Sequence, residues 1–274
     1  MASLLLVLIV IMDFRMGSVD EEGSGHVRFM TYNAKTMYAG QRRNGWGELA
    51  QEVITQDPDV LVMQDANNMF DIRRGRPDLF NAILGNRKAV TMGQYVVASR
   101  LPLKDCKAGW ISYRKEAHTY LHCVLVAHGV EIDLVTAHFL TPRMGLNAVR
   151  HEGVDGVDEW RQNMLDRLSQ ARTLSGHLGR LTRPRIVAGD LNAPERSAVV
   201  QMLLDTGLRD AWSSSSMGYG FTYGHALRPH IDFLRIDHIL VSDDIGVARA
   251  WVGGHEASEH SPVIADLRIH RNLP

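Results

Sequence analysis

The stretch that decides the fold is Val27–Asp65, in which three runs read VRFMTY (27–32), WGELAQEVITQ (46–56) and DVLVMQ (59–64). The first run alternates in the manner of a β-strand. The second carries apolar residues at helical spacing, and the third is an apolar run short enough for a buried strand. The resulting strand–helix–strand unit brings Asn33 and Asp65 to neighbouring strand ends, where α/β folds collect their chemistry.

The same patterns continue along the chain. Further strands are expected at residues 94–99, 121–127, 131–137, 185–188, 236–241, 248–252 and 263–267, with a hairpin turn at His128-Gly129. A short helix is expected at Ser197–Leu204 and a long one at Trp160–Leu178, with a core-facing stripe of Trp160, Met164, Leu168, Ala171, Leu174 and Leu178. Many strands with helices between them predict one α/β (α+β) domain of two sheets covered by helices.

The composition is that of a globular domain with almost no net charge. Of 274 residues, 45% are hydrophobic, and 30 Lys plus Arg face 31 Asp plus Glu. This balance argues against a sequence-independent nucleic-acid binder, which would neutralise many phosphates, although a local cationic cleft or a metal still allows a nuclease. A disulfide between Cys106 and Cys123 is one alternative, but we expect two reduced, partly buried thiols.

The N-terminus carries a short apolar run, Leu4–Met12. Crossing a bilayer needs about 20 apolar residues, and a secretory signal needs a basic start and a small-residue cleavage site that this run lacks. Three interpretations fit this run: an atypical secretory signal, the remnant of a membrane segment from a longer precursor, or a terminal segment with the apolar character of a β-strand. We favour an extracytoplasmic or membrane-associated protein over a cytoplasmic one. We expect residues 1–25 to be this segment and a linker, and residues 26–270 to be the folded domain.

Gly189-Asp190-Leu191-Asn192 follows an apolar run and is closed by Pro194. Alternate residues on extended backbone point the same way, so Asp190 and Asn192 could face one site. A carboxylate and an amide suit a hydrated Mg²⁺ and a phosphate oxygen. Asp-x-Asn is equally ordinary turn chemistry, so this motif alone decides nothing.

Glu259 and His260 precede the last strand, and Asp237 lies in an apolar run where a buried carboxylate needs a partner. If Asp237 holds one nitrogen of His260, the other nitrogen is presented to a water molecule, and the histidine becomes a stronger base. His138 follows a strand and could orient a phosphate or stabilise negative charge. Arg143, five residues later, could add a bidentate phosphate contact. His118, His122, His128, His225 and His230 are expected to be structural or solvated.

Five ordered motifs together resemble the endonuclease/exonuclease/phosphatase superfamily, which includes deoxyribonuclease I. They are Thr31-Tyr32-Asn33, Met63-Gln64-Asp65, Gly189 to Asn192, Ile236-Asp237-His238 and Ser258 to Pro262, and Thr136-Ala137-His138 matches a further element. The resemblance covers about residues 26–269. It implies a four-layer sandwich of two mixed β-sheets packed face to face, with helices on both outer sides.

The resemblance also implies a site. Mg²⁺ or Mn²⁺ would be held by Asp65, Glu259 and Asn33. The phosphate would be bound by Asn33, Asn192, His138 and Arg143, and the catalytic residues would be His260, Asp237, Asp190, Asn192 and His138. Two residues depart from the family pattern, because Asp65 replaces a glutamate and Glu259 an aspartate. If both bind one ion, the shorter and the longer side chain could compensate each other. The alternative is a degraded metal site in a catalytically inactive binding relative.

The predicted function is divalent-metal-dependent phosphodiester hydrolysis by a monomer, with DNA as the substrate of a nuclease. The alternative is a lipid-headgroup phosphodiesterase of the sphingomyelinase kind, or a sugar or inositol phosphatase, and Leu4–Met12 would suit membrane proximity. Three substrate-facing loops are expected at residues 67–78, 143–158 and 213–229. Their arginines and aromatic residues, among them Arg150 and Tyr223, form no pattern that identifies a substrate.

Overall fold

The Val27–Asp65 stretch folds as predicted. In the computed structural model it forms β2 (His26–Asn33), α3 (Gly45–Gln56) and β3 (Val60–Gln64), and β2 pairs in parallel with β3. The structure describes residues 15–16, 26–114, 116–225, 227 and 231–269. The predicted apolar segment 4–12 and linker 17–25 lie outside these residues. Among the described residues, no helix combines the length and apolarity that a membrane span requires.

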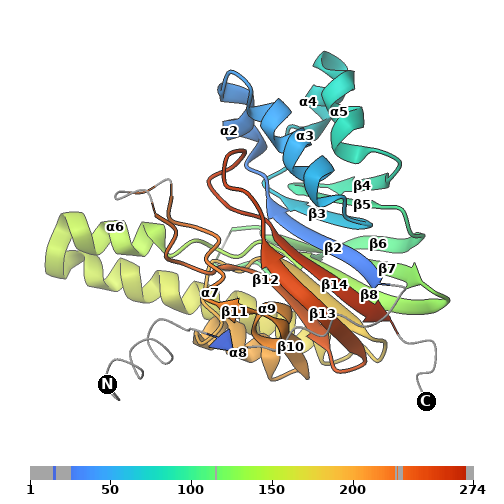
Figure 1. Cartoon of the computed structure of the whole chain (residues 1–274). Helices are drawn as coiled ribbons and strands as arrows, with labels where there is room; N and C mark the ends of the chain where they lie inside the picture. The colour runs from blue at the N-terminus through green and yellow to red at the C-terminus, as the bar shows by residue number, and fades with distance from the viewer. Residues whose placement is uncertain (1–14, 17–25, 115, 226, 228–230, 270–274) are drawn as a thin grey trace.

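The first sheet has six strands in the order β13-β14-β2-β3-β5-β4. Its other strands are β4 (Lys88–Met92), β5 (Tyr95–Ser99), β13 (Ile245–Val252) and β14 (Val263–Ile269), all paired antiparallel. Its outer face is covered by α3 together with α2 (Thr36–Gln41), α4 (Met69–Gly75) and α5 (Pro77–Leu84) (Figure 1).

The second sheet repeats this plan in the order β10-β12-β9-β8-β7-β6. Its strands are β6 (Leu103–Trp110), β7 (Thr119–Ala127), β8 (Val130–Ala137), β9 (Arg185–Asp190), β10 (Leu208–Asp210) and β12 (Asp237–Ser242), and only β8 and β9 are parallel. Its helices are α6 (Arg143–Glu152), η2 (Gly153–Gly156), α7 (Val157–Leu178), α8 (Ala198–Leu204) and α9 (Ala211–Ser215). A short ribbon of β1 (Arg15–Met16) and β11 (Met217–Gly218) lies apart from both sheets.

Side-chain alternation along the strands assembles four layers. In β2, Val27 and Phe29 pack between the two sheets, whereas Met30 and Tyr32 pack under the first layer of helices. Because strand side chains alternate between faces, this one strand contributes side chains both to the core between the sheets and to the core under the helices. A third core joins the second sheet to α7 and α8. The predicted four-layer sandwich is confirmed.

Three edge strands, β4, β6 and β10, were not predicted. No side chain of β4 or β6 is buried, so neither shows the apolar pattern of an inner strand, and β10 is only three residues long. The helix predicted at Trp160–Leu178 is present, but its predicted stripe is only half right. Ala171, Leu174 and Leu178 are buried, whereas Trp160 and Met164 are about 40% exposed. In this half of α7 the buried positions are polar, and they bind neighbouring loops through hydrogen bonds.

The expectation of free thiols was wrong, because Cys106 and Cys123 form a disulfide. Cys123 lies in β7, and Cys106 lies at an irregularity of the neighbouring strand β6, between Lys104 and Lys107, where the pairing register shifts. This bulge places the two thiols side by side across the strand pair. The segment 143–158, predicted to be a loop, is also different. It forms α6, η2 and the start of α7.

Candidate active site

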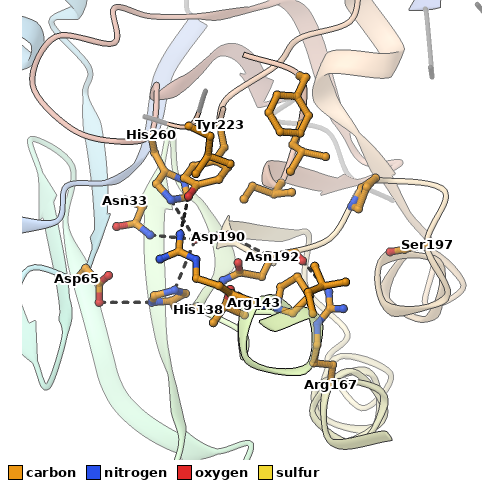
Figure 2. A pocket seen from close by; sticks show the side chains of 18 of the residues that line it. Asn33, Asp65, His138, Arg143, Arg167, Asp190, Asn192, Ser197, Tyr223 and His260 are labelled. Carbon is orange, nitrogen blue, oxygen red and sulfur yellow. Dashed lines mark hydrogen bonds and ion pairs between the residues drawn. The ribbon is translucent and has the colours of Figure 1, made fainter. Parts of the chain in front are cut away.

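The candidate residues meet at one edge of the two sheets, where the four parallel strands end. Asn33 ends β2, Asp65 follows β3, His138 follows β8, and Asp190 ends β9. All four line a cavity of about 660 Å³, together with Asn192, Arg143 and His260 (Figure 2). Asp237 lies behind His260 at the start of β12 and is 1% exposed. The structure therefore brings together residues that are far apart in the sequence.

The close approach of β8 and β9 depends on Gly189. A Cβ atom built on Gly189 would lie 2.0 Å from the backbone oxygen of Ala137, and its φ of +151° is a conformation that other residues rarely adopt. The following Asn192 and the first-sheet residue Asp65 both have left-handed backbone, with φ of 50° and 49°. Short Asn and Asp side chains tolerate this conformation better than longer ones, which is a local reason for an aspartate at position 65.

His260 and Asp237 form the predicted pair. The His260 Nδ1 atom lies 2.9 Å from Asp237 Oδ2, which also accepts a hydrogen bond of 2.6 Å from Thr222 Oγ1. With its proton on Nδ1, His260 turns Nε2 toward the cavity, and the ring of Tyr223 lies against it at 4.8 Å between centroids. Burial lowers the pKa of His260, but the charges of Asp237 and Asp190 outweigh burial and raise it.

Asp190 lies at the centre of the cluster. Its Oδ2 atom accepts a hydrogen bond of 2.9 Å from Asn33 Nδ2 and lies 3.5 Å from His138 Nε2 and 3.7 Å from His260 Nε2. Its Oδ1 atom accepts from the backbone nitrogen of Asn192 at 2.8 Å. One buried carboxylate therefore faces both histidines that sequence reasoning selected.

His138 is held by Gln94 and Tyr95, which the sequence did not single out, and lies close to the predicted metal ligand Asp65. Its Nδ1 atom lies 2.7 Å from Gln94 Oε1 and 3.6 Å from Asp65 Oδ1, and its backbone nitrogen donates to the Tyr95 hydroxyl at 3.1 Å. A proton on Nδ1 is thus directed to Gln94, and Nε2 faces Asp190 and the cavity. His138 thus lines the same cavity as Asn33, Asn192 and Arg143, and its contact with a phosphate stays a prediction.

A second unforeseen residue, Arg167 of α7, fastens the loops that carry His138 and Asn192. Its Nη2 atom donates to the backbone oxygen of Asn192 at 2.6 Å, and its Nε atom donates to that of Leu140 at 3.1 Å. The side-chain amide of Asn192 uses one of its hydrogens on the backbone oxygen of Phe139 at 2.9 Å, which leaves the other for a ligand. Burial lowers the pKa of the Arg167 guanidinium, although the charge of Asp190 opposes this effect.

Arg143 lines the cavity, but it is carried by a different element from the one predicted, and its phosphate contact stays a prediction. It begins helix α6 rather than lying in a loop, and its guanidinium donates to the Tyr223 hydroxyl. Since Tyr223 contacts His260, Arg143 lies close to the His260–Asp237 pair (Figure 2).

The predicted metal ligands fit a hard cation in their chemistry. The Oδ1 atom of Asn33 is buried without a hydrogen-bond partner, and Figure 2 shows it on the side of the amide away from Asp190. Asp65 and Glu259 both line a small cavity of about 210 Å³ beside the main one. Oxygen donors of this kind are what Mg²⁺ and Mn²⁺ bind. That these three residues hold the ion remains a prediction.

Glu259 has a partner in the structure, the ammonium group of Lys35. Burial raises the pKa of Glu259, but the hydrogen bond and charge of Lys35 more than offset this and hold it below its usual value. The carboxylate is therefore ionised, and a cation bound there would compete with Lys35. A tighter cluster consists of Asp190, Asp237 and His260, whose nearest ligand atoms all lie within 4.8 Å of one another. Because His260 Nδ1 is already bonded to Asp237, we interpret this cluster as handling protons.

The neighbouring histidine of the Ile236-Asp237-His238 motif points away from the site. His238 lies 2.7 Å from Asp210 through Nδ1 and 2.9 Å from the Ala193 backbone oxygen through Nε2. Asp210 also pairs with the buried Arg235 at 2.8 Å. Burial raises the pKa of Asp210, but Arg235 and His238 hold it well below its usual range. This buried network supports the start of β12, and hence Asp237.

Comparisons with known proteins agree with this geometry. The sequence pattern described as "Endonuclease/Exonuclease/phosphatase family" matches residues 30–260. No curated protein matches the chain significantly. Solved structures with the same fold include a mannosyl-6-phosphatase from Bacteroides thetaiotaomicron, with a TM-score of 0.63 and 18% identity, covering 89% of this chain and 100% of that one.

Two further structures share the fold at similarly low identity. One is TDP2 from D. rerio complexed with a single-strand DNA product, with a TM-score of 0.64 and 13% identity, covering 89% of this chain and 99% of that one. The other is the human Nocturnin catalytic domain with bound sulfate, with a TM-score of 0.64 and 15% identity, covering 89% and 95%. The chain therefore belongs to the endonuclease/exonuclease/phosphatase family, whose members hydrolyse phosphate esters.

Proposed function

We propose that the protein is a divalent-metal-dependent phosphodiesterase whose substrate is DNA. The observation that carries this proposal is the His260–Asp237 pair, whose free Nε2 faces the same cavity as Asp190, Asn33 and His138. A histidine held by a buried carboxylate is suited to accept a proton from water. The catalytically inactive alternative would leave this pair without a function.

In the proposed reaction, water attacks the phosphorus, one P–O ester bond breaks, and the leaving alkoxide takes a proton from solvent to become the alcohol. His260 takes the proton of the attacking water, and Asp237 stabilises the resulting imidazolium. The remaining amide hydrogens of Asn33 and Asn192 bind phosphate oxygens, and His138 stabilises the negative charge that develops on them. Mg²⁺ or Mn²⁺, when bound by Asp65, Glu259 and Asn33, would neutralise phosphate charge and stabilise the leaving oxygen.

Three observations favour a DNA strand over a long duplex. Arg143, Arg150 and Arg167 line the cavity, and Tyr223 and Phe233 add aromatic surface. Cationic grooves with aromatic platforms are typical of single-strand binding, whereas a net charge of −1 is poorly suited to a long duplex. TDP2, which has the same fold, was crystallised with a single-strand DNA product. The site is complete within one chain, so we propose a monomer.

A lipid-headgroup phosphodiesterase is the second candidate, because apolar side chains at the cavity are exposed. Leu146, Leu227 and Phe233 line it and are 54%, 40% and 43% exposed. We also propose an extracytoplasmic or membrane-associated location. The disulfide is typical of oxidising compartments, and the apolar run Leu4–Met12 could add a weak membrane contact. Sedimentation of the full chain with phosphatidylcholine vesicles tests the membrane contact.

The deciding experiment is a substrate panel of single-stranded DNA, plasmid DNA, RNA, sphingomyelin and inositol phosphates, with Mg²⁺ or Mn²⁺ and with EDTA. The proposal expects DNA to be cleaved, EDTA to abolish cleavage, and His260→Ala to lower kcat by about 10²- to 10⁴-fold. Full activity in chelator, or equal turnover by His260→Ala, would refute the mechanism. Turnover of lipid but not DNA would replace the substrate and leave the mechanism standing.

A further inference from the structure

One wall of the cavity carries three guanidinium groups that form no ion pair with any described carboxylate. The side chain of Arg143 donates to the Tyr223 hydroxyl, and Arg167 donates to two backbone oxygens. Arg150 makes no hydrogen bond or ion pair within the part of the chain that the structure describes. Other arginines are neutralised, as Arg28 is by Asp266. Three guanidinium groups without an ion pair favour an anionic ligand in this cavity.

The helix α6 arranges part of this wall by its periodicity. Arg143, Asn147 and Arg150 are separated by four and three residues, so they lie on one face of the helix. All three line the cavity. The opposite face is fixed by Gly145, where a Cβ atom would lie 2.9 Å from the Cα atom of Trp160 in α7. This close packing of α6 on α7 turns the arginine face toward the cavity.

The spacing separates Arg150 from the reacting centre. Arg143 begins α6 beside Tyr223, and seven residues of helix place Arg150 about 10 Å farther along the axis. Helical side chains lean toward the N-terminus of their helix, so the side chains of Arg150 and Asn147 lean toward Arg143, at the start of α6. They can thus reach a group that is attached to the reacting phosphate but distinct from it.

We propose that Asn147, Arg150 and the Nη1 group of Arg167 form a subsite for a second phosphate of the substrate. This inference rests on the proposed phosphodiesterase function and refines its substrate class to a nucleic-acid strand with at least two phosphates. Arg167 uses Nε and Nη2 on backbone oxygens, while its Nη1 donates to no described residue. Guanidinium groups bind phosphate oxygens with matching geometry. Leu146, Leu227 and Phe233 offer apolar surface in the same cavity to the nucleoside that joins the two phosphates.

The test compares three dinucleotides with Mg²⁺: TpT, which contains only the scissile phosphate, and pTpT and TpTp, which add one terminal phosphate at the 5′ or the 3′ end. The full chain is expected to cleave one of the two phosphorylated forms with a kcat/KM at least about tenfold above that for TpT, as for one hydrogen bond between charged groups. Arg150→Gln should remove this preference. The matched control is Arg161→Gln on α7, an exposed arginine that pairs with Asp158 and does not line the cavity; it should keep the preference.

The outcomes separate the two proposals. Cleavage of all three dinucleotides with equal kcat/KM would refute the subsite and leave the phosphodiesterase standing. An equal fractional loss on all three in Arg150→Gln would assign Arg150 to the reacting phosphate or to the fold, and would also refute the subsite. Cleavage of none by the unaltered protein would refute the proposed nuclease function and the nucleic-acid subsite with it.

Discussion

Replacement of Asp237 by asparagine should slow catalysis by an amount that the hydrogen bonds define. Asp237 Oδ2 accepts from both His260 Nδ1 and Thr222 Oγ1, whereas Oδ1 is buried without a partner. An asparagine would therefore place its oxygen at the Oδ2 position and its NH₂ group at the Oδ1 position. The His260 ring would keep its orientation and its proton on Nδ1, and only the negative charge would be lost.

The expected size follows from that charge. A hydrogen bond to a charged group contributes about 1.5–3 kcal/mol, and a neutral one about 0.5–1.5 kcal/mol. The difference of about 1–1.5 kcal/mol, together with a less basic His260, predicts that kcat falls about 10- to 100-fold. Asp237→Ala removes the partner altogether and should cost about 10²- to 10⁴-fold, the full contribution of a general base.

Initial rates on bis(p-nitrophenyl) phosphate at saturating Mg²⁺ measure kcat and KM, and thermal unfolding measures stability. Burial raises the pKa of Asp237, and the charge of Asp190 adds to this. The ionised carboxylate therefore disfavours the folded state at neutral pH. Its removal offsets the cost of burying an unpaired NH₂ group at the Oδ1 position, so Asp237→Asn should change Tm little. The reasoning fails if Asn and Ala are equally damaging, if the loss is confined to KM, or if Tm falls in step with activity.

Three further outcomes are expected. Asp65→Glu alone should weaken Mg²⁺-dependent activity, and adding Glu259→Asp should partly restore it; strictly additive losses would exclude a shared ion. Asp210→Asn should destabilise the fold by about 1.5–3 kcal/mol at pH 7, because it removes one of the two carboxylates that pair with the buried Arg235 and leaves Glu195 as the other. Since the pKa of Asp210 is lowered by folding, its stabilising contribution is complete above about pH 4 and is lost as pH falls below that value, so urea unfolding of the variant should depend less on pH there. Reduction of Cys106–Cys123, which are 17 residues apart, should lower stability by about 3 kcal/mol in the same assay, and an unchanged midpoint would contradict a disulfide in solution.

Much of the fold and the centre of the site could be predicted because they depend on local patterns. The strands that end at Asn33 and Asp190 are buried on both faces, so their apolar runs are conspicuous, and the polar residue that ends each run is easy to notice. The pairing of His260 with Asp237 was also predicted before the structure placed them 2.9 Å apart.

The supporting residues could not be predicted in this way, because their roles arise from contacts between distant segments. Gln94 and Arg167 look like ordinary surface residues in the sequence, yet they hold His138 and Asn192 across 44 and 25 positions of the chain. Lys35 reaches Glu259 across 224 positions. The disulfide was missed for a similar reason, because the irregularity at Cys106 becomes visible only once β6 is paired with β7.

Each sheet has a single parallel strand pair at its centre, β2–β3 in one and β8–β9 in the other, and the site draws residues from the ends of both. Each of the two sheets therefore contributes part of the candidate site. If one sheet slid over the other by about the width of one side chain, Asn33 and Asp190 would separate, although every hydrogen bond within the sheets would remain. The rate of turnover is thus more sensitive to the alignment of the two sheets than the circular dichroism signal, which reports secondary structure. In a urea titration it should vanish before the secondary structure does.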